Sequence, residues 1–100
     1  MAAGTATRRG IDALATVLRL IGMAIVLVLV LHIVLTILEA NPQNGLTEFI
    51  RDAADTFNLG LSNLFVPDNQ KLAVALNYGT AALIWFAITT VVLRVVRRVG

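Results

Sequence analysis

Residues 20–38 read LIGMAIVLVLVLHIVLTIL, nineteen positions without a formally charged side chain. A second uncharged stretch, LAVALNYGTAALIWFAITTVVL, fills residues 72–93. At about 1.5 Å per residue, helices of these lengths would extend roughly 28 and 33 Å, close to the ~30 Å hydrocarbon core of a bilayer. The two stretches therefore predict two transmembrane helices.

The composition favours a membrane protein over a soluble one. Of the 100 residues, 58% are hydrophobic and 14% are charged, whereas ordinary soluble domains have about 45–50% and about 25%. A soluble alternative would need two core helices that are apolar on every side, with almost no chain left to cover them. We predict an all-α integral membrane protein, a two-transmembrane helical hairpin with short amphipathic interfacial helices in the connecting segment.

The charged residues predict the orientation of this hairpin. Arginines precede the first apolar stretch and follow the second, while the connecting segment holds two cations and five acidic residues. Under the positive-inside rule, both termini are cytoplasmic and the connecting segment is external. The arginines expected to anchor lipid head groups are Arg8, Arg9, Arg94, Arg97 and Arg98.

The chain is accordingly divided into five segments. The ends are a cytoplasmic N-terminus with an inner extension of the first helix (1–19) and a basic cytoplasmic C-terminus (94–100). Between them lie the first span (20–38), the external segment (39–71) and the second span (72–93).

The N-terminal segment contains a twin arginine, which also occurs in export signals. The apolar run after Arg8 and Arg9 is longer than the core of about 7–15 residues in a signal peptide, and no A-x-A cleavage site lies near residues 38–40. We predict an uncleaved anchor, with a twin-arginine export signal as the alternative.

The connecting segment has the pattern of an amphipathic helix over residues 46–57. Turn formers at residues 41–45 mark its start, and Asn58-Leu59-Gly60 marks its end. A second short helix is expected over residues 61–66, and Asp68 or Asn69 is expected to cap the second span. These helices would seal the outer ends of the spans or offer a docking surface to another protein. The apolar face of the first helix consists of Leu46, Phe49, Ile50, Ala53 and Phe57.

Small residues on the second span predict a helix-packing face. Ala75, Gly79 and Ala82 share one side of this helix, and small residues at this spacing let two backbones approach closely. Trp85 lies near mid-span, away from the interfacial belt that tryptophan prefers, so we expect its indole N–H to bond within the bundle or with a neighbouring chain.

His32 is the only histidine of the chain, and it lies in the first span. An ionisable residue inside a membrane is costly and therefore a functional candidate. The expected role is helix packing, as a neutral imidazole that is hydrogen-bonded to a neighbouring helix. The alternatives are a proton or ion path, and a haem or metal ligand shared between chains.

An Asn-Pro-x-Asn turn and a Leu-x-x-Phe-Ile segment follow the first span, at residues 41–44 and 46–50. With the second apolar stretch, they resemble one repeat of the YggT family of small bacterial membrane proteins, across residues 31–86. That family usually has two repeats, and this chain has one. The resemblance implies an accessory factor of the bacterial cytoplasmic (inner) membrane, of a kind linked to osmotic stress tolerance or, in plastid relatives, to cofactor attachment on cytochromes. It implies no catalytic residue.

The sequence offers no catalytic constellation. Cysteine is absent, which excludes disulfides and thiolate metal sites. There is no Ser/His/Asp set and no glycine-rich phosphate loop, and a clustered basic face with stacking aromatics is missing. We expect no enzyme activity, cofactor, metal, nucleic acid or small-molecule substrate. The expected partners are membrane lipid and either further copies of the chain or other membrane proteins.

The predicted function is that of a structural or accessory component that forms a homo-oligomer or stabilises a larger membrane complex. One alternative is a pore-forming, holin-like protein, which can also have two spans with both ends inside. Small holins usually join their spans by a short turn, so the long acidic connecting segment favours the accessory role. The other alternative is a small subunit of a respiratory or transport complex.

Overall fold

The computed structural model describes residues 2–99, and its side chains from residue 4 onward. The elements are α1 (Ala2–Ile37), α2 (Gly45–Thr56) and α3 (Gln70–Val99), and residues 2–99 contain no strand. Met1 and Gly100, at the ends of the predicted terminal segments, lie outside the described residues. The prediction of an all-helical chain with two long apolar helices is confirmed for this part of the sequence.

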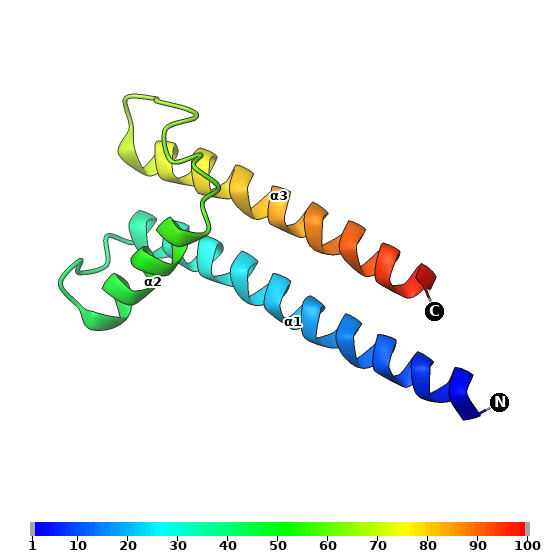
Figure 1. Cartoon of the computed structure of the whole chain (residues 1–100). Coiled ribbons are helices and arrows are strands. Elements are labelled where there is room, and N and C mark those ends of the chain that lie inside the picture. The colour runs from blue at the N-terminus through cyan, green and yellow to red at the C-terminus, as the bar shows by residue number, and fades with distance from the viewer. Residues whose placement is uncertain (1, 100) are drawn as a thin grey trace.

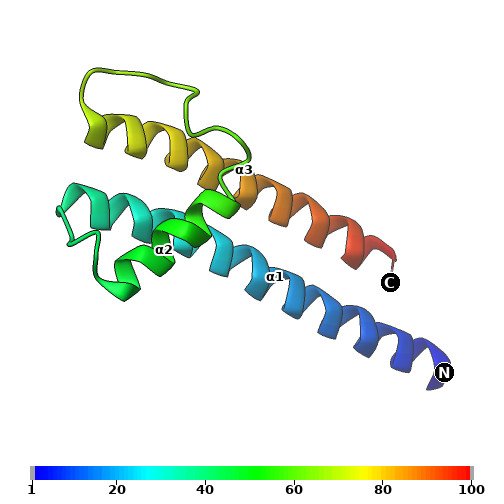
Figure 2. The same ribbon diagram turned by 60° about the vertical axis from the view of Figure 1, so that its left-hand side comes forward.

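α1 and α3 lie side by side and antiparallel, so that both ends of the chain are at the same end of the molecule (Figures 1 and 2). The expected inner extension of the first span is one unbroken helix with it. Both helices are long and apolar enough to cross a membrane. We call the end near the chain termini, where most of the arginines lie, the basic end, and the opposite end, where α2 lies, the capped end.

The core is thin because only two long helices and one short helix contribute to it. In the most apolar windows of α1 and α3, only 17% and 11% of the residues are buried. Most of the apolar surface of both helices therefore has no protein against it. The core cluster contains Ile25, Leu29, Ala54, Tyr78, Ala81 and Ala82.

Two contacts show how α1 and α3 are aligned. His32 lies against Tyr78 near the capped end, and Gly22 lies against Thr89 nearer the basic end. A Cβ atom added to Gly22 would be 2.9 Å from the Cβ of Thr89, a distance that real Cβ atoms do not show. The absence of a side chain at Gly22 is thus what lets the two backbones approach here.

α1 ends in a Schellman motif. The amide of Glu39 donates to the Thr36 carbonyl at 3.1 Å, and the amide of Ala40 donates to the Leu35 carbonyl at 2.9 Å. Glu39 occupies the left-handed position with φ 57°, where glycine is usual. Its carboxylate lies 3.0 Å from the Nζ of Lys71, which joins the end of α1 to the first turn of α3.

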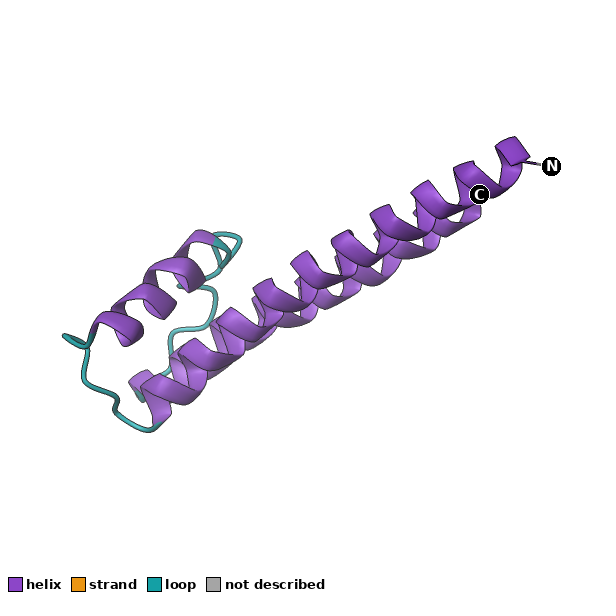
Figure 3. Cartoon of the chain, turned by 90° about the horizontal axis from the view of Figure 1, so that it is seen from below, coloured by secondary structure: helices purple, strands orange, loops and turns teal. Residues whose placement is uncertain are grey.

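α2 begins at the turn that the sequence predicts and runs obliquely back along the long helices (Figure 3). Asn44 is its N-cap, and the Asn44 side chain accepts a hydrogen bond from the Leu46 amide at 2.9 Å. Beyond Thr56 the chain turns through Leu59 and Gly60, both with positive φ. It then returns along α3, where Asn69 caps the helix by accepting from the Leu72 amide at 3.2 Å.

The second short helix expected over residues 61–66 is not formed, and this segment has a turn at residues 62–63 followed by irregular backbone. One reason is Pro67, which disfavours helical backbone at the residue before it. The other is Asn77, whose side chain takes up backbone groups of Ser62 and Phe65 that a helix would use. A helix at this position would leave the buried amide of Asn77 without these partners.

Candidate functional site

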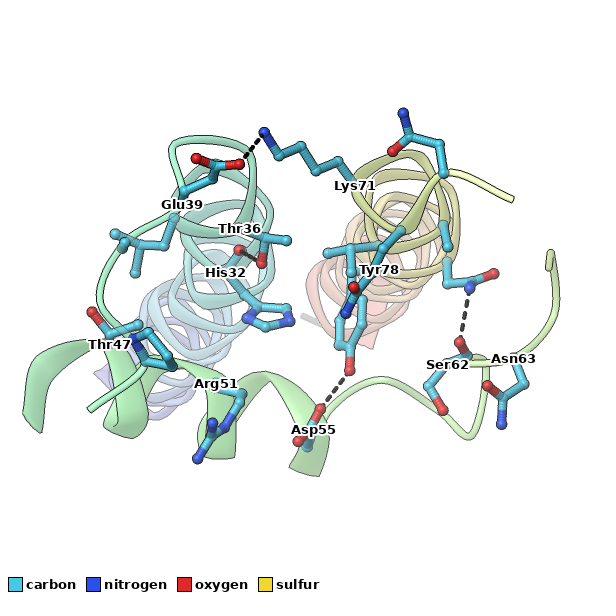
Figure 4. A pocket seen from close by; sticks show the side chains of 18 residues that line it. His32, Thr36, Glu39, Thr47, Arg51, Asp55, Ser62, Asn63, Lys71 and Tyr78 are labelled. Atoms are coloured by element: carbon cyan, nitrogen blue, oxygen red, sulfur yellow. Dashed lines mark hydrogen bonds and ion pairs between the residues drawn. The ribbon is translucent and has the colours of Figure 1, made fainter. Parts of the chain in front are cut away.

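A polar vestibule with a volume of about 910 Å³ lies at the capped end of the molecule. It is bounded by the last turns of α1, the inner face of α2, the first turns of α3 and the turn at residues 62–63 (Figure 4). The volume lies within the range of about 300–1,000 Å³ that is usual for small-molecule sites. Its polar and charged lining includes His32, Thr36, Glu39, Arg51, Asp55 and Lys71.

Two aromatic rings close the deep end of the vestibule. Among the lining residues, His32 is the farthest from the capped end on α1, and Tyr78 is the farthest on α3. Their ring centroids are 4.5 Å apart in an edge-to-face arrangement, and the rings point toward each other between the helices (Figure 4). The Tyr78 hydroxyl donates to Oδ1 of Asp55 on α2. Three helices therefore meet at this point.

The charges around the vestibule are balanced. Arg51 and Lys71 contribute two cations, and Glu39 and Asp55 contribute two carboxylates. Lys71 and Glu39 pair with each other at the rim. The guanidinium of Arg51 has only long carboxylate contacts, 4.0 Å to Glu48 and 3.7 Å to Asp52.

Asn77 holds the wall formed by the return segment. It is 2% exposed, and its Oδ1 accepts from the Phe65 amide at 2.7 Å. Its Nδ2 donates to the carbonyls of Ser62 at 2.8 Å and Phe65 at 2.9 Å. One side chain thus fixes a stretch of irregular backbone against α3.

Trp85 holds the end of α2. Its indole N–H donates to the Phe57 carbonyl at 2.8 Å, and the two rings make an edge contact with centroids 6.0 Å apart. Trp85 is fourteen residues beyond Lys71, or about 21 Å along α3. The C-terminal end of α2 therefore reaches far along the apolar part of α3, and α2 does not lie flat across the helix ends.

The residues predicted to form the helix-packing face differ in their burial. Ala82 is buried, whereas Ala75 and Gly79 are half-buried. A Cβ atom at Gly79 would meet only Ile33, at 4.0 Å, so the tighter of these two glycine contacts between the helices is at Gly22. His32 makes an edge-to-face ring contact with Tyr78 between the helices. Within residues 4–99 its imidazole makes no hydrogen bond.

The predicted apolar face of α2 is divided between core and surface. Ile50 is buried, and Ala53 and Phe57 are half-buried. Leu46 and Phe49 are 68% and 66% exposed, and Ala54, outside the predicted set, is fully buried. The buried side of α2 is therefore turned away from the predicted apolar face, because α2 packs against α1 while Asp55 is held by Tyr78.

The arginines expected at lipid head groups all lie exposed near the basic end. Arg94, Arg97 and Arg98 line a shallow hollow with Thr90 and Leu93. None of the five predicted arginines makes an ion pair within residues 4–99. They are therefore available to anionic groups outside the chain.

Sequence reasoning missed Asn77, Tyr78 and Asp55 as a group. The available signal was that Asn77 and Tyr78 are adjacent polar residues in an otherwise apolar stretch that faces an acidic helix. No group of three or more His, Asp or Glu side chains within the described residues is arranged to hold a metal ion. No family model matches the sequence, and no curated protein or solved structure shows significant similarity to it.

Proposed function

We propose that this chain is a non-enzymatic, structural or accessory protein of the bacterial cytoplasmic membrane, in which α1 and α3 are the transmembrane helices of a hairpin. The supporting observation is that the apolar surface of both helices is mostly unburied. In the most apolar window of each helix, only 17% of the residues of α1 and 11% of those of α3 are buried. Such a surface needs lipid or other transmembrane helices against it. The resemblance to the YggT family favours the same role.

The capped end supports a structural rather than a catalytic role. Its conspicuous polar side chains hold backbone or each other, as Asn77, Tyr78 and Trp85 do. A rigid external cap on two lipid-facing helices is a suitable platform for self-assembly or for holding another membrane protein. We further propose that the exposed side chains of Leu46 and Phe49 lie in the outer interface of the membrane.

Cysteine labelling tests the membrane placement directly, because the chain has no cysteine of its own. Asn63→Cys reports on the connecting segment, and Val99→Cys reports on the basic end, and both positions are exposed. We expect an impermeant maleimide to label the first variant in intact cells and the second only after permeabilisation. The reverse pattern would contradict the orientation, and recovery of both variants in the soluble fraction would contradict the membrane assignment.

Native mass spectrometry from a gentle detergent tests the assembly. We expect a discrete homo-oligomer or a stable complex with other membrane proteins. A lone monomer would contradict the accessory role. If a homo-oligomer also conducts ions in planar bilayers, the chain is instead a pore former.

A further inference from the structure

The vestibule at the capped end separates a cation and an anion by one helical turn. Arg51 and Asp55 are four residues apart on α2, so their Cβ atoms are about 6 Å apart. They do not pair with each other, because Arg51 makes its two long contacts with Glu48 and Asp52. On Asp55, Tyr78 engages Oδ1 and leaves Oδ2 as an acceptor.

This spacing suits a ligand that carries both charges on neighbouring atoms. A simple anion would face Asp55 and Glu39, and a simple cation would face Arg51 and Lys71, so either one alone meets repulsion in the vestibule. A phosphate beside the guanidinium and an ammonium beside the carboxylate would each meet a charge of the opposite sign.

The remaining lining suits the part of a lipid that joins head group and chains. Leu35, Ala73 and Val74 form apolar walls between the charged groups. The vestibule lies where α1 ends and α3 begins, next to long apolar surfaces that have no protein against them. In the membrane placement proposed above, this is the level of the outer head groups.

We propose that the vestibule binds the head group of a zwitterionic phospholipid, with its phosphate at Arg51 and its ammonium at Asp55. This inference rests on the proposed membrane placement. The same chemistry occurs in a free phosphodiester such as glycerophosphoethanolamine, so the source of the head group is part of the test.

The test uses the full chain, delipidated in detergent and titrated with lipid under native mass spectrometry. We expect one phosphatidylethanolamine to bind per chain at least tenfold more tightly than phosphatidylglycerol, which carries the phosphate without the ammonium. Arg51→Gln should weaken this binding about tenfold, because a charge-assisted contact to phosphate is lost. Arg94→Gln is the matched control at the basic end, and it should leave phosphatidylethanolamine binding unchanged.

A competition arm with glycerophosphoethanolamine identifies the source. If glycerophosphoethanolamine displaces the lipid only at a large molar excess, the ligand is a membrane lipid. If it displaces the lipid at equal concentration, the head group alone is the ligand, and the assignment to lipid is overturned. Equal binding of the two phospholipids, loss of binding in Arg94→Gln but not in Arg51→Gln, or a vestibule that holds only water would overturn the proposal itself.

Two controls keep this result separate from folding and from the proposed function. Arg51 makes only long, exposed ion contacts, so Arg51→Gln should leave the protection of α2 amides from hydrogen exchange unchanged. Cysteine labelling at residues 63 and 99 should also be the same with and without Arg51→Gln. Failed lipid binding with intact labelling would overturn the vestibule site alone, whereas failed labelling would overturn the membrane placement.

Discussion

The capped end and the basic end of the molecule are held together by different interactions. At the capped end, α2 and the return segment 57–69 are attached to the long helices by side-chain hydrogen bonds from Tyr78, Asn77 and Trp85. Toward the basic end, α1 and α3 pack closely where Gly22 lies against Thr89.

This difference follows from the kinds of residue that pack together at each end. In the proposed membrane placement, two apolar helices gain little from leaving lipid for each other, so close backbone approach has to supply the contact energy. The short, acidic helix α2 and the irregular chain after it have polar groups that need defined partners wherever they pack against the long helices. Hydrogen bonds therefore determine where α2 lies, while small residues determine how near α1 and α3 come.

The largest expected effect is at Asn77, which makes three hydrogen bonds to the return segment. Asn77→Ala leaves the Phe65 amide and two carbonyls without this partner. We expect the free energy of unfolding, measured by denaturant titration in mixed micelles, to fall by about 2–4 kcal/mol. Hydrogen exchange at residues 62–66 should accelerate more than exchange in α1.

The matched control is Asn63→Ala, because Asn63 lies in the same segment but is exposed. It should change the free energy of unfolding by less than about 0.5 kcal/mol. If both variants had equal effects, Asn77 would not be the residue that holds the segment.

The second prediction concerns the close contact nearer the basic end. Gly22→Ala places a methyl group against the Thr89 side chain. We expect a loss of about 1–3 kcal/mol in the free energy of unfolding, since neither backbone can move without disturbing its neighbours. Thr89→Ala in the same chain should restore part of the loss, and a double variant no better than Gly22→Ala would show that the helices do not meet here.

Gly10→Ala is the matched control for this contact. Apart from the backbone of its own helix and its chain neighbours, nothing lies within 4 Å of a Cβ at Gly10, which is also in α1. Alanine favours a helix over glycine by about 1 kcal/mol. We therefore expect Gly10→Ala to stabilise the chain slightly, the opposite sign to Gly22→Ala.

The elements that sequence reasoning predicted correctly depend on local patterns. Uncharged runs predicted the two long helices, the turn formers at residues 41–45 marked the start of α2, and Asn69, one of two expected caps, caps α3. An amphipathic pattern also predicted α2, since its charged and apolar residues alternate with helical periodicity.

The contacts that sequence reasoning did not find join residues far apart in the chain. Asp55 and Tyr78 are 23 residues apart, and Phe57 and Trp85 are 28 apart. A pattern along one helix shows that it has an apolar side, but it does not show which part of that side meets another helix. This is why the pattern placed Leu46 and Ile50 on one apolar face without showing that Ile50 and Ala54 are buried in the chain while Leu46 is exposed.

The third prediction separates the attachment of α2 from the stability of the whole chain. Tyr78→Phe keeps the ring against His32 but removes the hydroxyl that donates to Asp55. We expect the free energy of unfolding to fall by about 1–2 kcal/mol, near the low end of the contribution of a hydrogen bond to a charged group, because Asp55 is exposed. Hydrogen exchange of the α2 amides should accelerate. Exchange in the part of α1 between Gly22 and the basic end should change little. Asp55→Asn completes a double-mutant cycle, and strictly additive effects would mean that the two residues do not interact.

The smallest effect is expected at Glu39, where two opposing contributions nearly cancel. Its left-handed backbone, φ 57°, is strained for any residue but glycine, so Glu39→Gly relieves strain at the end of α1. The same change removes the exposed ion pair with Lys71, which is worth about 0–1 kcal/mol and is screened by salt. We expect Glu39→Gly to change the free energy of unfolding by less than about 1 kcal/mol. The change should become more stabilising as salt is added, because salt screens the ion pair that the substitution removes. Glu39→Gln retains the strain and loses only the charge, so it should be slightly destabilised at low salt and match the unaltered chain at high salt. If Glu39→Gln lost much of the free energy of unfolding even at high salt, then Glu39, like Asn77, would make contacts that hold the capped end together.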